Sequence, residues 1–171
     1  MIILDSSGTI TSEQWDEVLV MLRLLIMAID SHSTIGVTSR VALINFASVI
    51  THEFSLDDNF NKEQILRYID DGQIVRKGGL SFLVPVINQA RDILLRDPRG
   101  YISGTIRATN AVILFTDALP SPNISAFQFF LLSTEQQRAL LVLELKKLET
   151  VLESLMLEGV HVNLIGKLLS L

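Results

Sequence analysis

Apolar and polar positions along the chain follow two periods, one typical of strands and the other typical of helices. Strand-type apolar runs occur at residues 2–4, 40–47, 49–54, 111–116 and 160–165. Apolar residues spaced by three and four predict helices over residues 11–30, 62–69, 83–95 and from 133 or 134 to about 158. Polar turns rich in Gly, Asp and Ser separate these segments. The pattern therefore predicts strands that alternate with helices.

The order of these segments indicates the architecture. Strands 40–47 and 49–54 are separated by little more than Ser48, which predicts an antiparallel hairpin. Residues 111–116 form an uninterrupted apolar run, as expected of a central strand buried on both faces. Thr11 followed by Gln14 predicts a capping box at the start of the first helix. We therefore expect an α/β fold, doubly wound, with a mostly parallel central sheet, one antiparallel edge hairpin and helices on both faces.

Length and composition agree with one folded domain over residues 1–171. The chain has 171 residues, of which 49% are hydrophobic, and its mean hydropathy is +0.41. A chain of this length buries roughly 70% of the surface of its unfolded state, so it needs no disulfide or metal to fold. It has no cysteine, which excludes disulfides, thiolate metal sites and cysteine nucleophiles.

Charge and hydropathy exclude two classes of partner. The net charge is −5, and the longest basic clusters are the pairs Arg76-Lys77 and Lys146-Lys147. We therefore expect no nucleic-acid binding, which normally requires a basic patch. The best apolar run, residues 18–29, is interrupted by Arg23 and is too short to span a bilayer, so we expect no membrane insertion.

Oxygen-bearing side chains follow two of the predicted strands. Asp5, Ser7 and Thr9 come directly after the first strand, and Asp117 comes after strand 111–116. Ligands of such sheets bind at the carboxyl ends of the strands, where these residues would meet. Carboxylate and hydroxyl oxygens suit Mg²⁺ or Mn²⁺ better than zinc or copper. Ordinary turn chemistry also explains Asp, Ser and Gly after a strand, so the first loop alone leaves both interpretations open.

Six segments, in order, resemble the von Willebrand factor A domain, which is the fold of integrin I domains. LDSSGTI resembles the DxSxS loop of that family, and TSRVALINFAS is similar to its second strand. NKEQILRYID resembles the short helix that follows, and KGGLSFLVPVINQAR resembles the GGxTxxxxAL segment. VILFTDA is similar to the strand that ends in Thr-Asp-Gly, and EGVHVNLIG to a late strand that ends in Ile-Gly. The resemblance covers most of the chain.

The resemblance implies a metal-ion-dependent adhesion site. It assigns the metal to five residues, Asp5, Ser7, Thr9, Ser81 and Asp117. In the family an acidic side chain of a partner protein completes the coordination of Mg²⁺ or Mn²⁺. The resemblance thus implies a non-enzymatic, adhesion-type, protein-binding domain, located outside the cell or at its surface.

The chain departs from the family pattern in several places. Thr9 stands for Ser, Ser81 for Thr, and Ala118 for the usual Gly. The family would also add a last strand and a helix after residue 171. We therefore expect either a fragment of a longer chain or a domain that lacks these elements.

Two other functions stay open from the sequence. The first loop also resembles the DxDGT loop of haloacid-dehalogenase-like phosphatases, in which Asp5 would be the nucleophile beside Mg²⁺. Against this, Ser7 replaces the second Asp of that motif, and Gly166-Lys167-Leu168-Leu169 supplies no acidic pair after the late strand. The other possibility is a von Willebrand-type scaffold with a silent metal site that binds proteins through its helices.

A leucine row in the long last helix is the feature through which such a scaffold could bind. Its residues recur at spacings of four and three, as in a heptad seam. They are Leu141, Leu145, Leu148, Leu152 and Leu155. The row would either pack on the sheet of its own domain or contact a partner helix.

Overall fold

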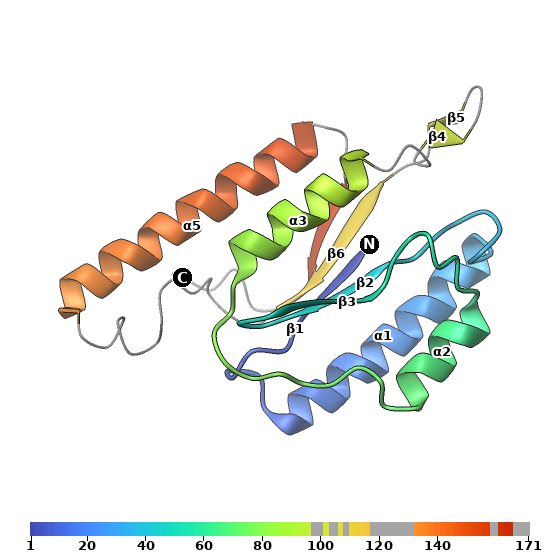
Figure 1. Ribbon diagram of the computed structural model, residues 1–171, viewed down its shortest axis with the longest axis horizontal. Helices are drawn as coiled ribbons and strands as arrows, with labels where there is room; N and C mark the ends of the chain where they lie inside the picture. The colour runs from blue at the N-terminus through green and yellow to red at the C-terminus, as the bar shows by residue number, and fades with distance from the viewer. Residues whose placement is uncertain (97–100, 103–105, 108–109, 117–131, 158–160, 166–171) are drawn as a thin grey trace.

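Five strands form the central sheet of the protein, in the order β3-β2-β1-β6-β7 (Figure 1). The structure is a computed structural model that describes residues 1–96, 101–102, 106–107, 110–116, 132–157 and 161–165. The strands are β1 Ile2–Asp5, β2 Leu43–Phe46, β3 Ile50–Phe54, β6 Ala111–Phe115 and β7 His161–Ile165. Strands β2 and β3 pair antiparallel, and the other neighbouring strands of this sheet pair parallel. The expected α/β sheet with an antiparallel edge hairpin is confirmed.

Helices cover both faces of the sheet. Helices α1 (Ser12–His32) and α2 (Lys62–Asp70) lie on one face, and α3 (Leu83–Arg96) and α5 (Thr134–Leu157) lie on the other (Figure 1). The continuous apolar run of β1 explains this arrangement, because successive side chains point to opposite faces. Ile2 and Leu4 pack in the core beneath α1, and Ile3 packs in the core beneath α3.

Helix α1 begins where the sequence predicted, at a capping box. Gln14 N donates to Thr11 Oγ1 at 3.3 Å, and Thr11 N donates to Gln14 Oε1 at 2.8 Å. Helix α2 begins with the same motif, built by Asn61 and Gln64, with both bonds at 2.9 Å. The first box fixes the end of the loop that follows β1, which is where the candidate site lies.

Two elements differ from the prediction. Strand β2 begins at Leu43 rather than at residue 40, although Val41 and Ala42 before it are buried. The sequence also did not predict the antiparallel pair β4 (Tyr101–Ile102) and β5 (Ile106–Arg107), which forms a separate small sheet. Strands of two residues are too short to show a period, so hydrophobic patterning could not reveal them.

The leucine row of α5 packs at least partly within the domain. Leu148 is buried and Leu152 packs against the same core, on the face shared with α3. Leu141 and Leu145 are half-buried, and the side chain of Leu155 lies outside the described residues. A partner contact through this row stays a prediction. No helix in the described part of the chain is long and apolar enough to cross a membrane.

Candidate metal site at the carboxyl end of the sheet

Asp5, the last residue of β1, is the centre of the candidate site. Its side chain is fully buried, and its two carboxylate oxygens accept hydrogen bonds from three segments of the chain. Ser7 N donates to Oδ1 at 2.9 Å, while Ser81 Oγ and Thr116 Oγ1 donate to Oδ2 at 2.8 and 2.7 Å. Hydrogen bonds to a carboxylate are stronger than those between neutral groups, so Asp5 ties these three segments together.

Two further hydroxyls extend the site from the interior to the surface. Ser7 Oγ and Thr9 Oγ1 lie 3.1 Å apart. Ser7 is buried, whereas Thr9 is exposed. The oxygen atoms of the loop therefore form a row that begins at the buried carboxylate and ends in solvent.

The structure brings together four of the five predicted site residues, namely Asp5, Ser7, Thr9 and Ser81. Asp117 lies outside the described residues. Thr116 was not predicted as a site residue, although its hydroxyl bonds directly to Asp5. A signal for it existed in the sequence, because Thr116 follows a central strand at the carboxyl edge where site residues gather.

Backbone hydrogen bonds join the two loops that carry the site. Gly8 N donates to Gly79 O and Gly78 N donates to Ser6 O, both at 2.8 Å. Ser6 in turn donates from both its backbone N and its Oγ to Phe46 O, at 2.8 and 3.1 Å. The loop after β1 is thus fixed both to the end of β2 and to the α2–α3 loop. These bonds hold Ser81 near Asp5 although 76 positions separate the two residues.

Gly79 is required where the α2–α3 loop approaches the end of β2. Its φ is +85°, a left-handed conformation that favours glycine. A Cβ at this position would lie 2.6 Å from Ser48 Oγ, which is too close unless Ser48 shifts. Ser48 Oγ also accepts a hydrogen bond from Leu80 N at 2.8 Å, so it holds the residue next to Ser81.

A second, half-buried polar network anchors the same loop further along the hairpin. Lys77 Nζ donates to Asn45 O at 2.7 Å and to Thr51 Oγ1. The side-chain amide of Asn45 donates from Nδ2 to Val75 O at 2.9 Å and to Glu53 Oε1 at 3.1 Å. Burial lowers the pKa of Lys77 below its ordinary value, and the nearby Glu53 carboxylate opposes this shift. Asn45 Oδ1 is buried and has no hydrogen-bond partner within the described residues. The network therefore fixes the loop by side chains that the metal site does not use.

The chemistry of the donors fits a hard divalent cation. Within the described residues Asp5 forms no ion pair with any Lys, Arg or His side chain, so its buried charge is balanced only by hydrogen bonds. The same part of the chain contains no group of three His, Cys, Asp or Glu side chains that could hold a metal. One carboxylate and several hydroxyls form an oxygen set of the kind that Mg²⁺ and Mn²⁺ prefer.

Comparison with known sequences shows two kinds of match. A family model described as the von Willebrand factor type A domain matches residues 1–137. Matrilin-3 of Gallus gallus is 27% identical over 122 residues, which are 71% of this chain and 26% of matrilin-3. The chain thus spans about a quarter of the length of that relative.

Solved structures share the fold over nearly the whole chain. Manganese-loaded TRAP protein of Plasmodium vivax matches with a TM-score of 0.68 and 22% identity, over 96% of this chain and 55% of that protein. Proximal thread matrix protein 1 from the mussel byssus, with a zinc-occupied MIDAS motif, matches with a TM-score of 0.64 and 22% identity. The match covers 96% of this chain and 37% of that protein. At these identities the two structures show that the fold is shared.

Proposed function

The chain belongs to the von Willebrand factor type A domain family, and from this membership we propose that it is an adhesion-type domain that binds protein through a divalent cation. The cation, Mg²⁺ or Mn²⁺, would be held by the predicted set Asp5, Ser7, Thr9, Ser81 and Asp117. An acidic side chain of a partner protein would complete the coordination. The observation that carries this proposal is the buried Asp5 carboxylate, which accepts hydrogen bonds from the backbone N–H of Ser7 and from the hydroxyls of Ser81 and Thr116.

Each residue has a role that follows from its chemistry. Asp5 supplies negative charge, and the hydroxyls of Ser7 and Thr9 supply neutral oxygen atoms. Ser81 and Thr116 hold the Asp5 carboxylate in place through their hydrogen bonds. The few carboxylates of the site do not neutralise the charge of a bound divalent cation. The remaining positive charge favours a carboxylate of another protein as a further ligand.

The two matching structures support a divalent metal in this fold, since one is manganese-loaded and the other has a zinc-occupied MIDAS motif. We also propose that the domain acts outside the cell or at its surface, without enzymatic activity. The match to a thread matrix protein of the mussel byssus supports that location. Family membership favours this function over the phosphatase alternative, which an assay with an aryl phosphate would test independently.

The direct test is the stability of the protein with and without a cation. Unfolding is measured in EDTA and then in millimolar Mg²⁺ or Mn²⁺. An ion that binds only the folded state raises its stability by about 2.7 kcal/mol at a hundredfold excess over the dissociation constant. We expect this increase in the wild type and its loss in Asp5→Ala.

Two variants keep the test interpretable. Thr9→Val removes the hydroxyl of an exposed residue while preserving the shape of the side chain, so it should fold normally and respond more weakly to the cation. Asp16→Ala removes an exposed carboxylate of α1 outside the site, and it should respond like the wild type. Equal stability of the wild type in EDTA and in Mg²⁺ or Mn²⁺ would overturn the proposal and leave a scaffold with a silent metal site.

A further inference from the structure

Asn45 is a polar residue within the buried strand β2, between Ile44 and Phe46. Its side chain is fully buried, and its Oδ1 has no hydrogen-bond partner in the described part of the chain. A buried acceptor without a partner destabilises a fold, and an apolar residue of similar shape avoids that cost. Stability alone therefore does not explain an Asn at this position, and the groups that its Nδ2 holds become the relevant ones.

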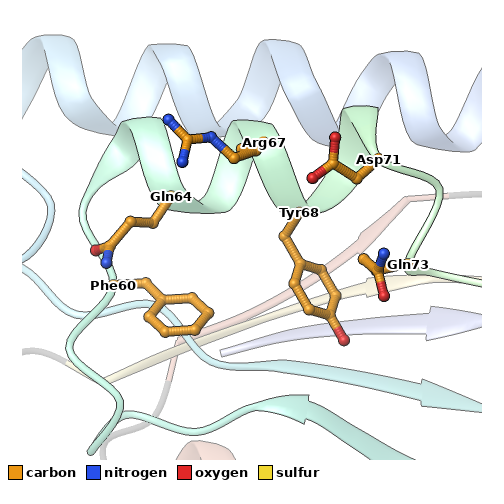
Figure 2. Close-up of a pocket in the computed structure, with 6 residues that line it drawn as sticks. All are labelled: Phe60, Gln64, Arg67, Tyr68, Asp71 and Gln73. Atoms are coloured by element: carbon orange, nitrogen blue, oxygen red, sulfur yellow. The ribbon is translucent and has the colours of Figure 1, made fainter.

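The amide nitrogen of Asn45 joins strand β3 to the α2–α3 loop. Nδ2 donates to Glu53 Oε1 at 3.1 Å and to Val75 O, a carbonyl of the loop, at 2.9 Å. Glu53 is itself held by α2, because its Oε2 accepts from Tyr68 OH at 3.1 Å. Figure 2 shows the Tyr68 ring extending from α2 toward the strands, with its hydroxyl at the far end. Glu53 thus orients the amide, and both amide hydrogens have an acceptor.

Lys77 attaches the loop to the same place two residues further on. Its Nζ donates to Asn45 O at 2.7 Å and to Thr51 Oγ1. Asn45 and Thr51 are opposite each other in the antiparallel pair of β2 and β3. Val75 and Lys77 are therefore fixed to one point of the hairpin, the first through its backbone carbonyl and the second through its side chain.

This attachment lies just before the part of the loop that reaches the candidate site. The loop runs from α2 on one face of the sheet to α3 on the other (Figure 1). Gly78 and Gly79 follow Lys77, with φ of +69° and +85°. Because glycine adopts positive and negative φ about equally readily, the anchored residues around the pair select its conformation. Lys77 therefore contributes to placing the Ser81 hydroxyl 2.8 Å from Asp5.

We propose that Asn45 and Lys77 are positioning residues of the cation site. They fix the start of the loop, so that Ser81 already lies beside Asp5 when a cation arrives. The inference rests on the proposed function, since Ser81 enters it as a residue of that site. Residues that orient metal ligands without touching the metal typically change metal affinity 10–100-fold when they are replaced.

The charge of Lys77 separates positioning from electrostatics. Lys77→Met keeps much of the length of the side chain but removes the ammonium group and its positive charge. Coulomb's law alone predicts tighter binding of a cation after that loss, because repulsion is reduced. Positioning predicts weaker binding, because the loop loses its attachment to Asn45 O and Thr51 Oγ1. The two effects therefore have opposite signs.

The experiment is a calorimetric titration of the full chain with Mn²⁺. We expect the Kd to rise by about tenfold in Lys77→Met and in Asn45→Leu, which leaves the net charge unchanged. Lys77→Arg retains a cationic donor and should bind nearly as well as the wild type. Unchanged or tighter binding in both Lys77→Met and Asn45→Leu would overturn the inference and leave the proposed function intact. A wild type that binds no Mn²⁺ would refute the proposed function and the inference with it.

Two further variants control for a general loss of stability and for charge. Leu22→Ala removes a fully buried side chain of α1, so it should lower the free energy of unfolding without changing the Kd while the protein is folded. Arg67→Met removes a positive charge from an exposed residue of α2 (Figure 2) and should bind Mn²⁺ at least as tightly as the wild type. If Leu22→Ala weakens binding as much as Lys77→Met, lost stability accounts for the effect and the inference is wrong.

Hydrogen exchange in EDTA tests the position of the loop without a cation. Gly78 N donates to Ser6 O and Leu80 N donates to Ser48 Oγ, both at 2.8 Å. In Lys77→Met these two amides should exchange several-fold faster than in the wild type, since the loop opens locally more often. The amide of Ser33, which caps the far end of α1, should exchange at the wild-type rate. Unchanged exchange at Gly78 and Leu80 would contradict a positioning role for Lys77.

Discussion

Hydroxyl side chains at the candidate site are matched to the space around them. Thr9 is exposed, so its position has room for an additional methyl group. Ser81 is only 2% exposed and its hydroxyl is 2.8 Å from Asp5, so the smaller residue occupies the crowded position. Thr9 and Ser81 both depart from the family pattern, but each keeps a side-chain hydroxyl oxygen at its position in the candidate site.

Thr116 is expected to stabilise the buried carboxylate of Asp5. Thr116→Val keeps the shape of the side chain but removes the hydroxyl that donates to Oδ2 at 2.7 Å. Hydrogen bonds to charged groups contribute about 1.5–3 kcal/mol, so we expect the free energy of unfolding to fall by about 2 kcal/mol in urea titrations. Thr116→Ser retains the hydroxyl and should retain most of the stability. A loss in Thr116→Ser with no loss in Thr116→Val would show that the methyl group matters instead of the hydroxyl.

Tyr68 predicts a pH dependence of stability in the alkaline range. Burial raises the pKa of Tyr68 above 10.0, and the hydrogen bond to Glu53 acts in the same direction. Because the folded pKa is the higher one, this stabilisation is present below pH 10 and is lost as pH rises through the folded value. The stability advantage of wild type over Tyr68→Phe should therefore be constant from pH 7 to about 9 and then decrease. If the stability difference between wild type and Tyr68→Phe stays constant up to about pH 11, the raised pKa of Tyr68 is contradicted.

At the scale of elements, the site depends on loops more than on helices or strands. The loop after β1 and the α2–α3 loop exchange hydrogen bonds between Gly8 and Gly79 and between Gly78 and Ser6. Neither loop has a regular period, so their contact follows from backbone geometry. Glycines allow the close approach because they have no Cβ.

Gly78 and Gly79 form a matched pair of test positions in the same loop. Both have positive φ, +69° and +85°, but a Cβ on Gly78 meets nothing within 4 Å, whereas one on Gly79 meets Ser48 Oγ at 2.6 Å. Gly78→Ala should cost about 1 kcal/mol for the left-handed backbone alone. Gly79→Ala should cost clearly more and should also weaken the response to Mg²⁺, since the loop carries Ser81. Equal unfolding free energies of the two variants would show that Ser48 moves aside freely.

At the scale of the whole molecule, two apolar cores share one sheet. Trp15, Leu22 and Ile26 of α1 belong to the core on one face, and Leu148 of α5 belongs to the core on the other. Strand β1 contributes to both, through Leu4 on one side and Ile3 on the other. The two layers should therefore unfold in a single transition.

Leucine substitutions in α1 and α5 test this coupling. Leu22→Ala and Leu148→Ala remove side chains that are 0% and 3% exposed, and each should lower the free energy of unfolding by about 2–5 kcal/mol. Leu24→Ala and Leu143→Ala, at 59% and 47% exposed, should change it by less than about 0.5 kcal/mol. Unfolding of each variant is monitored by circular dichroism and by fluorescence. A second unfolding transition that appears only in Leu148→Ala would show that α5 unfolds separately.

Hydrophobic patterning was sufficient for the main elements. The period of α1 and its Thr11–Gln14 box, and the uninterrupted run of β6, are local properties of the chain. The sequence also named Asp5, Ser7, Thr9 and Ser81, which the structure brings together, because they follow a strand or match a family motif. Thr116 was missed since a hydroxyl after a strand is common, and only its 2.7 Å distance to Asp5 makes it part of the site.

The sequence by itself determined the α/β class, the strand and helix segments and the oxygen chemistry of the first loop, because these depend on residue type and local period. The tertiary structure alone decided which hydroxyls reach the Asp5 carboxylate, that a Cβ at Gly79 would meet Ser48, and that the rings of Phe54, Phe60 and Tyr68 pack together. These properties join residues far apart in the chain. Their distances are set by how the helices pack on the sheet, which no local pattern specifies.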